Sequence, residues 1–418
     1  MLCLSQNNIS LLKYCLRTLV GSGLKPKTDF QKPLRSLIPK HISLISDNVR
    51  TFIPSKSVVT TDSGRELSYD ILVVAAGLQI NWNAIKGLRE ALADSTSGVS
   101  SIYSYSTCDK VWNDIEGLHS GKAVFTQPAG VIKCAGGASI YILAGELRSI
   151  PPVAPQKIMW MAWDRFRRTN RSDKISVEFF TGMPTMFAVK KYSDVLNALK
   201  EERKIGGGFQ HNLVAVDSKS RKATFQKSGG STVDIFYTSL HATPPMGPLD
   251  FIKQSPLADA AGWVSVDSAT LQHTNPEYAN VFSLGDCSSL PTSKTAAAIA
   301  AQTPVVAENV YCFLEQGRAV SAHYDGYTSC PVSSAHRSHF QCYVLILYKL
   351  LTGYGELLLA EFKYGLEPKE TFGAFVDQAK SQRAFYWLKK DLFPYVYWNY
   401  MASFDLGSTC WNFSLLVI

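Results

Sequence analysis

The 418-residue chain has little of what marks several common protein classes. Its nine cysteines include no Cys-x-x-Cys pair, and it has only eight histidines, so neither a disulfide scaffold nor a metal site is indicated. It has no dense run of lysine or arginine, so a nucleic-acid partner is not expected despite the net charge of +8. No apolar run reaches the roughly 18 residues that a membrane-spanning helix needs. What remains is a chain in which individual cysteines can be reactive.

The residues that are present indicate a large folded protein. Apolar residues make up 46% of the chain and charged residues 18%, a balance typical of globular proteins. The length allows two or three domains with a sizeable buried core. The modest basic excess is compatible with an anionic cofactor or with an anionic membrane surface.

The two ends of the sequence differ from the rest. The first 28 residues hold four basic residues and no acidic residue, which is typical of a mitochondrial targeting segment, although a missing amino terminus would leave the same pattern. Residues 385 to 400 form a dense aromatic cluster with three charges. Tyrosine and tryptophan favour membrane interfaces, so this segment is predicted to lie in one leaflet. A dimer interface or an ordinary core would use the same residues.

Short apolar runs alternate with helical stretches, which predicts an α/β fold with parallel sheets. Residues 71 to 76 are β-branched or small and apolar on both faces, as expected for a central parallel strand. We expect further strands over residues 123–126, 175–180 and 280–284, and helices over residues 158–168 and 295–310, the second kinked at Pro304.

One strand end carries the first chemical signal. The apolar run that starts at Ile71 closes on Ala76 and Gly77. Small residues at this point let the backbone pass close to a flat or phosphorylated ligand. Many strands end in Ala-Gly, so this signal is weak when taken alone.

A second strand end strengthens the indication of a ligand site. The run that starts at Asn280 closes on Gly285 and Asp286, whose carboxylate can accept hydrogen bonds from sugar or ribityl hydroxyls. Lys294 and the helix that follows it would aim positive charge and N–H groups at an electron-rich ring such as a reduced flavin. The two strand ends together indicate a flavoprotein with two dinucleotide-binding domains.

A third feature concerns the electron donor. Flavoproteins that oxidise NADH carry a Gly-x-Gly-x-x-Gly turn in their second dinucleotide domain. Here the strand over residues 123–126 runs into Gln127 and Pro128, and a proline has no N–H to offer a phosphate. Nicotinamide binding is therefore predicted to be lost, so the electrons must come from another donor.

Motifs spread along the chain point to one family. They are Val131-Ile-Lys-Cys134-Ala-Gly, Ala154-Pro-Gln-Lys-Ile-Met159, Val189-Lys-Lys-Tyr192, His241-Ala-Thr-Pro-Pro-Met246, the stretch Val281 to Ala298, Tyr324-Asp-Gly-Tyr-Thr-Ser-Cys-Pro331, Glu361-Phe-Lys-Tyr364 and Tyr397-Trp-Asn-Tyr400. Together they resemble the eukaryotic, mitochondrial sulfide:quinone oxidoreductases. The resemblance covers roughly residues 17 to 401.

The resemblance implies a fold and a division into domains. The fold is α/β with two Rossmann-like dinucleotide-binding domains, similar to the flavin disulfide reductases, and a carboxy-terminal amphipathic membrane-contacting segment. We expect an incomplete FAD-binding domain over residues 17–120 and 255–330, and a second dinucleotide-like domain over residues 121–254. A membrane-associated region would occupy residues 331–418.

The resemblance also implies a chemistry. Cys134 and Cys330 would be linked through sulfur, and hydrosulfide would attack that bridge to leave a persulfide on Cys330. The freed Cys134 thiolate, favoured electrostatically by the neighbouring Lys133, would pass two electrons to the flavin. The persulfide sulfur would go to a small thiol or to sulfite, and the electrons to ubiquinone at the surface of the mitochondrial inner membrane, with the protein bound peripherally or monotopically.

The same resemblance assigns the cofactor and its residues. FAD would be bound through Gly285, Asp286, Lys294 and the backbone at Ala76 and Gly77. Val49 lies where the family contacts the adenine end of FAD. Cys287 is expected to pack beneath the flavin turn, and the six remaining cysteines are taken as structural.

The chain departs from the family pattern in several places. The first βαβ unit with its Gly-x-Gly-x-x-Gly turn is absent, so the targeting composition of residues 1–16 is taken as accidental. Residues 137–153 and 333–350 are insertions that read either as translated non-coding sequence or as species-specific loops, and the tail after Met401 loses the pattern. Weak FAD binding is therefore expected. Two alternatives stay open, a type II NADH:quinone oxidoreductase-like flavoprotein and a non-catalytic truncated product.

A geometric expectation follows for the two cysteines. A linked pair needs Cα atoms about 4.4–6.8 Å apart, so Cys134 and Cys330 should face one another at the flavin. Both insertions begin within three residues of a cysteine. Because loop closure costs little entropy when a loop leaves from the surface, both insertions should be extruded. A separation of about 12 Å or more would exclude the two-cysteine mechanism.

Overall fold

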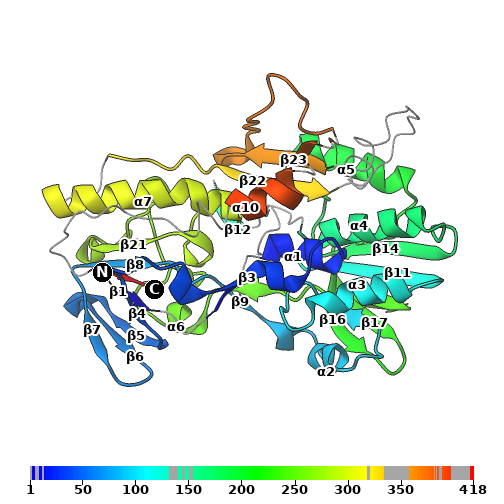
Figure 1. Cartoon of the computed structure of the whole chain (residues 1–418), viewed down its shortest axis with the longest axis horizontal. Coiled ribbons are helices and arrows are strands. Elements are labelled where there is room, and N and C mark those ends of the chain that lie inside the picture. Colours follow the sequence, from blue (N-terminus) through cyan, green and yellow to red (C-terminus); the bar gives the residue numbers. More distant parts are fainter. Residues whose placement is uncertain are drawn as a thin grey trace.

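The computed structural model describes residues 2–4, 9–11, 14–130, 140–143, 146–149, 154–317, 321–333, 357–380, 382, 384–385, 388–396 and 415–418. Its centre is a pair of five-stranded sheets whose described strands all run parallel. In Figure 1 the first sheet lies in the left half of the molecule and the second in the right half. Two parallel sheets confirm the predicted α/β class.

The first sheet contains the strand on which the sequence argument began. Its order is β21-β8-β24-β1-β4, which are Val281–Ser283, Ile71–Val74, Leu415–Val417, Leu2–Leu4 and Ser43–Ile45. All four residues of β8 are buried, which explains why the strand is apolar on both faces. β8 pairs in parallel with β21, so the predicted joint sheet of these two strands is confirmed.

Helix α7 (Ala296–Gln316) covers one face of the first sheet, as Figure 1 shows. The side chain of Thr295 accepts a hydrogen bond from the N–H of Ala298, which fixes where the helix begins. Val305, Val306 and Val310 pack into the same core as β8 and β21. The helix continues through the position of Pro304.

Strand β24 lies in the middle of the first sheet, between β8 and β1. Leu416 pairs with Leu72 on one side and with Leu2 on the other, and its side chain is 1% exposed. The backbone of Ile418 continues the ladder, since its N–H donates to Val73 and its carbonyl accepts from Ala75. The sequence predicted a membrane-associated region up to residue 418, whereas these residues belong to the first sheet.

The second sheet has the order β10-β19-β11-β14-β15. These strands are Val99–Ser100, Ser239–His241, Gly121–Gln127, Ile175–Thr181 and Gly206–Phe209. Helices α3 (Cys108–Gly117), α4 (Ala154–Arg168) and α5 (Lys190–Glu202) supply residues to its core. β10 joins this sheet although the predicted boundary at residue 120 put it in the first domain.

Smaller elements surround the two sheets. One antiparallel sheet holds β5 (Val49–Ile53), β6 (Val58–Thr61) and β7 (Glu66–Ser68), and another holds β16 (His211–Asp217), β17 (Lys222–Lys227) and β18 (Thr232–Phe236). Two-stranded pairs are β2 (Ile9–Leu11) with β3 (Gln31–Pro33), β9 (Gln79–Ile80) with β20 (Met246–Gly247), and β22 (Thr328–Ser333) with β23 (Leu357–Phe362). The other α-helices are α1 (Tyr14–Gly21), α2 (Leu88–Ala93), α6 (Asp250–Lys253) and α10 (Phe393–Val396), and a π-helix, η8, spans Leu388–Leu392.

The two predicted insertions are described only in part. Within residues 137–153, β12 (Ile140–Leu143) and β13 (Glu146–Ser149) form a two-stranded antiparallel sheet of their own. Of residues 333–350, Ser333 ends β22 and the others lie outside the described residues. Across the described ranges, no helix is both long enough and apolar enough to cross a membrane.

Candidate functional site

The candidate site lies at the carboxyl ends of two strands of the first sheet, β8 and β21. After β8 the chain reaches Gly77, whose φ is +87° and beside which a Cβ atom would meet no other atom within 4 Å. After β21 the chain turns at Gly285, whose φ is +75°. Ligands of open α/β sheets bind outside the carboxyl ends of the strands, so the open space beside Gly77 lies where a ligand is expected.

Asp286 directly follows Gly285, and Lys294 lies near enough to feel its charge. The side chains of Lys294 and Asp286 are 3% and 2% exposed. The Lys294 ammonium donates to the Ser288 carbonyl at 2.5 Å and lies 4.7 Å from the centre of the Trp263 ring. Burial lowers the pKa of Lys294 to about 8, and the nearby Asp286 carboxylate opposes that shift. A basic group is thus held in a poorly solvated place directly before α7.

The amino end of α7 offers further polar groups. Thr295 caps the helix, and its hydroxyl contacts that of Thr328 at 2.8 Å. The Ser293 hydroxyl is fully buried and has no hydrogen-bond partner within the described residues. A helix amino end with a buried lysine and a buried hydroxyl suits an electron-rich polar ring. These residues therefore fit a flavin.

Cys330 lies on β22 and is 1% exposed. Its strand is joined to α7 through the Thr295–Thr328 contact and also packs against α4, whose Ile158 and Met159 share the core that contains Cys330. The segment before β22 is held as well, because the Thr292 hydroxyl donates to the Gly326 carbonyl at 3.1 Å. Cys330 is thus carried on a fixed strand beside the amino end of α7.

Cys134 lies outside the described residues, so its separation from Cys330 stays a prediction. Helix α4, which follows Cys134 in the chain, packs against β22. Cys287 is fully buried, and its thiol donates to the Val74 carbonyl at 3.4 Å. Burial raises the pKa of the Cys287 thiol, which disfavours the reactive thiolate and fits the predicted packing role.

Val49 begins β5 and packs, half-buried, against the core of the first sheet. Its predicted contact with the adenine end of FAD stays a prediction. The sequence argument placed Gly77, Gly285, Asp286 and Lys294 in one site, and the structure puts all four at the carboxyl edge of the β8–β21 pair or directly beneath it.

The corresponding edge of the second sheet is filled by the chain's own side chains. The Asn212 carbonyl oxygen accepts from the N–H of Ala129 at 2.7 Å, and Gln127, 1% exposed, donates to the Thr181 hydroxyl at 3.1 Å. A Cβ atom on Gly182 would come within 2.3 Å of the Ala129 nitrogen. The N–H that a dinucleotide phosphate would use is therefore already bonded. The sequence argument missed Asn212, because it reaches this turn from 83 residues away.

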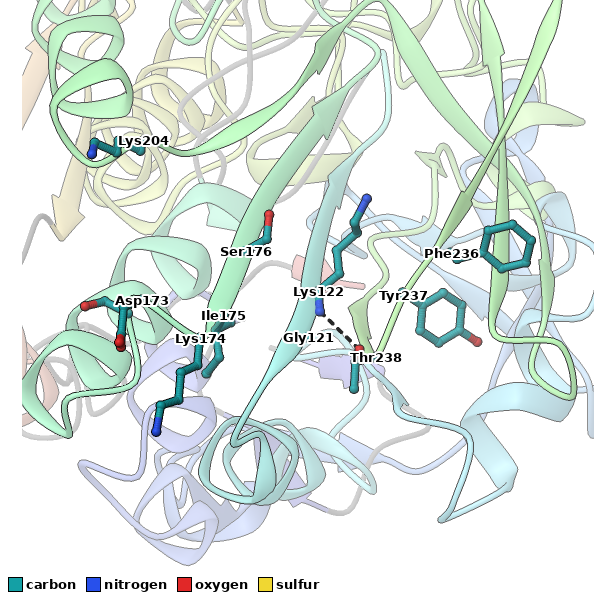
Figure 2. Close-up of a pocket in the computed structure, with 11 residues that line it drawn as sticks. Gly121, Lys122, Asp173, Lys174, Ile175, Ser176, Lys204, Phe236, Tyr237 and Thr238 are labelled. Atoms are coloured by element: carbon teal, nitrogen blue, oxygen red, sulfur yellow. Dashed lines mark hydrogen bonds between the residues drawn. The ribbon is translucent and has the colours of Figure 1, made fainter.

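An open pocket of about 720 Å³ lies at the opposite, amino edge of the second sheet. Figure 2 shows Lys122 and Lys174 beside the first residues of β11 and β14, with the N–H of Lys122 donating to the Thr238 hydroxyl. The exposed Phe236 forms part of the rim. None of the candidate site residues lines this pocket.

Comparison with known proteins decides the family. No protein-family model matches the chain. The mitochondrial sulfide:quinone oxidoreductase of Schizosaccharomyces pombe is 45% identical over 390 residues, which cover 92% of this chain and 77% of that protein. The mouse (Mus musculus) enzyme of the same name is 40% identical over 386 residues, covering 92% and 76%. The chain belongs to the sulfide:quinone oxidoreductase family.

A solved sulfide:quinone oxidoreductase shares the fold. The enzyme of the hyperthermophilic bacterium Aquifex aeolicus superposes with a TM-score of 0.71 at 17% identity, covering 97% of this chain and 86% of that one. The predicted family, the oxidoreductase class and the two-domain α/β fold are confirmed. The family membership makes this chain a sulfide:quinone oxidoreductase rather than an NADH-oxidising relative.

Proposed function

We propose that this sulfide:quinone oxidoreductase oxidises hydrogen sulfide through Cys134 and Cys330 and delivers the electrons to ubiquinone by way of FAD. The observation that carries the proposal is the position of Cys330. Cys330 is buried and lies on a strand whose residue Thr328 contacts Thr295 at the amino end of α7, the helix that fits the flavin ring. A reactive sulfur on β22 would therefore be held beside the electron acceptor.

FAD would be held by the backbone at Ala76 and Gly77, by Gly285 and Asp286, and by Lys294 with the amino end of α7; Val49 would contact its adenine end. When bound, FAD would supply a two-electron acceptor at this place. Lys294 and the N–H groups of α7 would stabilise negative charge that develops there on reduction. Asp286 would accept hydrogen bonds from hydroxyl groups of the cofactor.

The cysteines would carry out the sulfur chemistry. Hydrosulfide attacks the Cys134–Cys330 disulfide, forms a new bond to the Cys330 sulfur and releases Cys134 as a thiolate. The outer persulfide sulfur is then transferred to a small thiol or to sulfite, which leaves Cys330 as a thiolate. Re-formation of the disulfide from the two thiolates releases two electrons, which bound FAD would accept and ubiquinone would finally receive, and it returns both cysteines to their starting state.

Ubiquinone is dissolved in the lipid bilayer, so the protein would have to reach it at a membrane surface. Phe375 is 89% exposed, and Tyr395 on α10 is 56% exposed. Exposed aromatic side chains of this kind favour the interface between lipid and water. Together with the mitochondrial relatives, they support a peripheral or monotopic position on the mitochondrial inner membrane.

The test uses the purified full chain supplied with FAD and a short-chain ubiquinone. Sulfide should reduce the quinone in the wild type, and Cys330→Ser and Cys134→Ser should abolish this reaction. Cys312→Ser, at a thiol outside the site, serves as the matched control and should retain the wild-type rate. A Cys330→Ser variant with the wild-type rate would refute the two-cysteine mechanism. Reduction by NADH as fast as by sulfide would favour the NADH:quinone alternative, and a chain that retains no flavin would favour the non-catalytic product.

A further inference from the structure

A buried carboxylate lies behind the strand that carries Cys330. Glu361, on β23, is 3% exposed. Its oxygens accept from the Tyr327 hydroxyl at 2.5 Å, from the Thr371 N–H at 2.7 Å and hydroxyl at 3.0 Å, and from the Gln378 side-chain amide at 2.8 Å. All four donors are neutral groups. The carboxylate is therefore kept in the interior by hydrogen bonds from several directions.

The partners of Glu361 come from distant parts of the chain. Tyr327 directly precedes β22, while Thr371 and Gln378 belong to the segment after β23. The backbone N–H of Glu361 donates to the Tyr192 hydroxyl on α5 at 3.3 Å, and that hydroxyl donates to Glu370 at 2.8 Å. Three of the sequence motifs, at residues 189–192, 324–331 and 361–364, thus meet at one residue, Glu361, the first through its backbone and the second through its carboxylate.

The pairing of β22 and β23 fixes how Glu361 relates to the cysteine. Ser329 lies opposite Glu361, and Cys330 lies opposite Ala360. Successive side chains of a strand point to opposite faces, so Glu361 and Cys330 lie on opposite faces of this pair of strands. Glu361 therefore fixes the strand from the face opposite to the Cys330 side chain.

The arrangement resists movement of the strand. Tyr327 is three residues before Cys330, so the hydrogen bond from its phenol to Glu361 holds the start of β22. Any shift of β22 away from β23 would leave a buried carboxylate short of donors, which is costly. On the other side, the Thr295–Thr328 contact holds the same strand to α7.

We propose that Glu361 is a positioning residue for Cys330, acting through the hydrogen-bonded cluster of Tyr327, Thr371 and Gln378. The cluster holds β22 in the place where Thr328, two positions before the cysteine, contacts Thr295 at the amino end of α7. The importance of this position rests on the proposed role of Cys330. The positioning itself can be measured without any turnover.

The experiment measures how fast iodoacetamide alkylates Cys330 in the reduced, folded full chain, with mass spectrometry of the Cys330 and Cys287 peptides. Cys330 is 1% and Cys287 0% exposed, so both react only when the structure opens, and Cys287 reports global opening. In Glu361→Ala we expect Cys330 to react about tenfold faster relative to Cys287. Glu367→Gln, at an exposed carboxylate of the same segment, is the matched control and should match the wild type.

A conservative variant separates hydrogen bonding from charge. In Glu361→Gln the amide oxygen can still accept from Thr371 and Gln378, and the amide nitrogen can donate to the two hydroxyl groups once these rotate. We expect its Cys330 reactivity to stay within about twofold of the wild type. If Glu361→Ala does not fold, Tyr327→Phe removes one donor alone and should give an increase of about threefold.

Several outcomes would overturn the proposal. In Glu361→Ala, Cys330 and Cys287 could accelerate by the same factor, which would mean global loosening, or Cys330 could stay as slow as in the wild type. A Gln variant as reactive as the Ala variant would contradict the hydrogen-bonded basis. A failure of the proposed function would instead appear as full quinone reduction by Cys330→Ser, and it would leave the alkylation result unchanged.

Discussion

The hydroxyl of Thr328 lies 2.8 Å from the hydroxyl of Thr295, and both side chains are buried. Thr295 is the residue that caps α7, and Thr328 stands two positions before Cys330. One hydrogen bond therefore joins the strand that carries Cys330 to the helix that fits the electron acceptor. The cap and the contact share a single hydroxyl, so a change at Thr295 affects both.

The contact between the two threonines should be measurable as a coupling energy. We expect Thr328→Val to destabilise the fold by about 1 kcal/mol, because it leaves the partner hydroxyl buried without this bond. Thr295→Val should cost more, about 2 kcal/mol, because the helix cap is lost as well. Urea unfolding of both single variants and the double variant would give a coupling of about 1 kcal/mol. Strict additivity would show that the contact contributes nothing.

Leu416 should be as important to stability as any residue of the central strands. It is 1% exposed and lies between Leu72 and Leu2. Leu416→Ala is expected to lower the free energy of unfolding by about 2–5 kcal/mol, because it leaves a cavity in the first core. Phe236→Ala, at a side chain 63% exposed, is the control and should change stability by about 0.5 kcal/mol or less. Equal effects of the two substitutions would mean that β24 does not occupy the sheet in solution.

Lys294 should give the stability a defined pH dependence. Burial lowers its pKa from 10.5 to about 8, so between these values the unfolded chain holds a proton that the folded chain has released. The contribution of this group therefore rises as the pH increases from about 8 to about 10.5, and below pH 8 the buried charge destabilises the fold. At pH 7, Lys294→Met should be more stable than the wild type by up to roughly 3 kcal/mol.

The corresponding measurement is urea unfolding of the wild type and Lys294→Met at several pH values from 7 to 10. The difference between them should shrink steadily above pH 8. Lys227→Met, at an exposed lysine at the end of β17, controls for the general effect of removing a positive charge. A difference that stays constant over the whole range would contradict the burial of a charged Lys294.

The sequence predicted the parallel strands well, because a strand that is buried on both faces consists mainly of apolar residues. Ile71–Val74 is apolar throughout, Val281–Ser283 is apolar except for Ser283, and a glycine follows each strand within three residues, so both their existence and their shared edge followed from local patterns. The buried Lys294 before α7 was found for the same reason, since strand, turn and helix follow one another in the chain.

Other parts of the site could not be predicted, because they depend on residues far apart in the sequence. Asn212 closes the edge of the second sheet from a different hairpin, and nothing near Pro128 indicates it. Glu361 looks like an ordinary residue of an edge strand until Tyr327 and Gln378 meet it in space. Leu415–Val417 is too short to show a period, and its two neighbouring strands lie at the start of the chain and near residue 72.

The place of β24 has a consequence for how the protein is made. Leu2 and Leu416 are partners in one sheet although about 400 residues separate them, so the sheet is completed only after residue 416 has left the ribosome. Until then β8 and β1 each present an open, apolar edge that another chain could pair with. The newly made protein should therefore depend on chaperones until β24 has taken its place between β8 and β1. A bulky fusion placed directly after Ile418 should prolong that dependence.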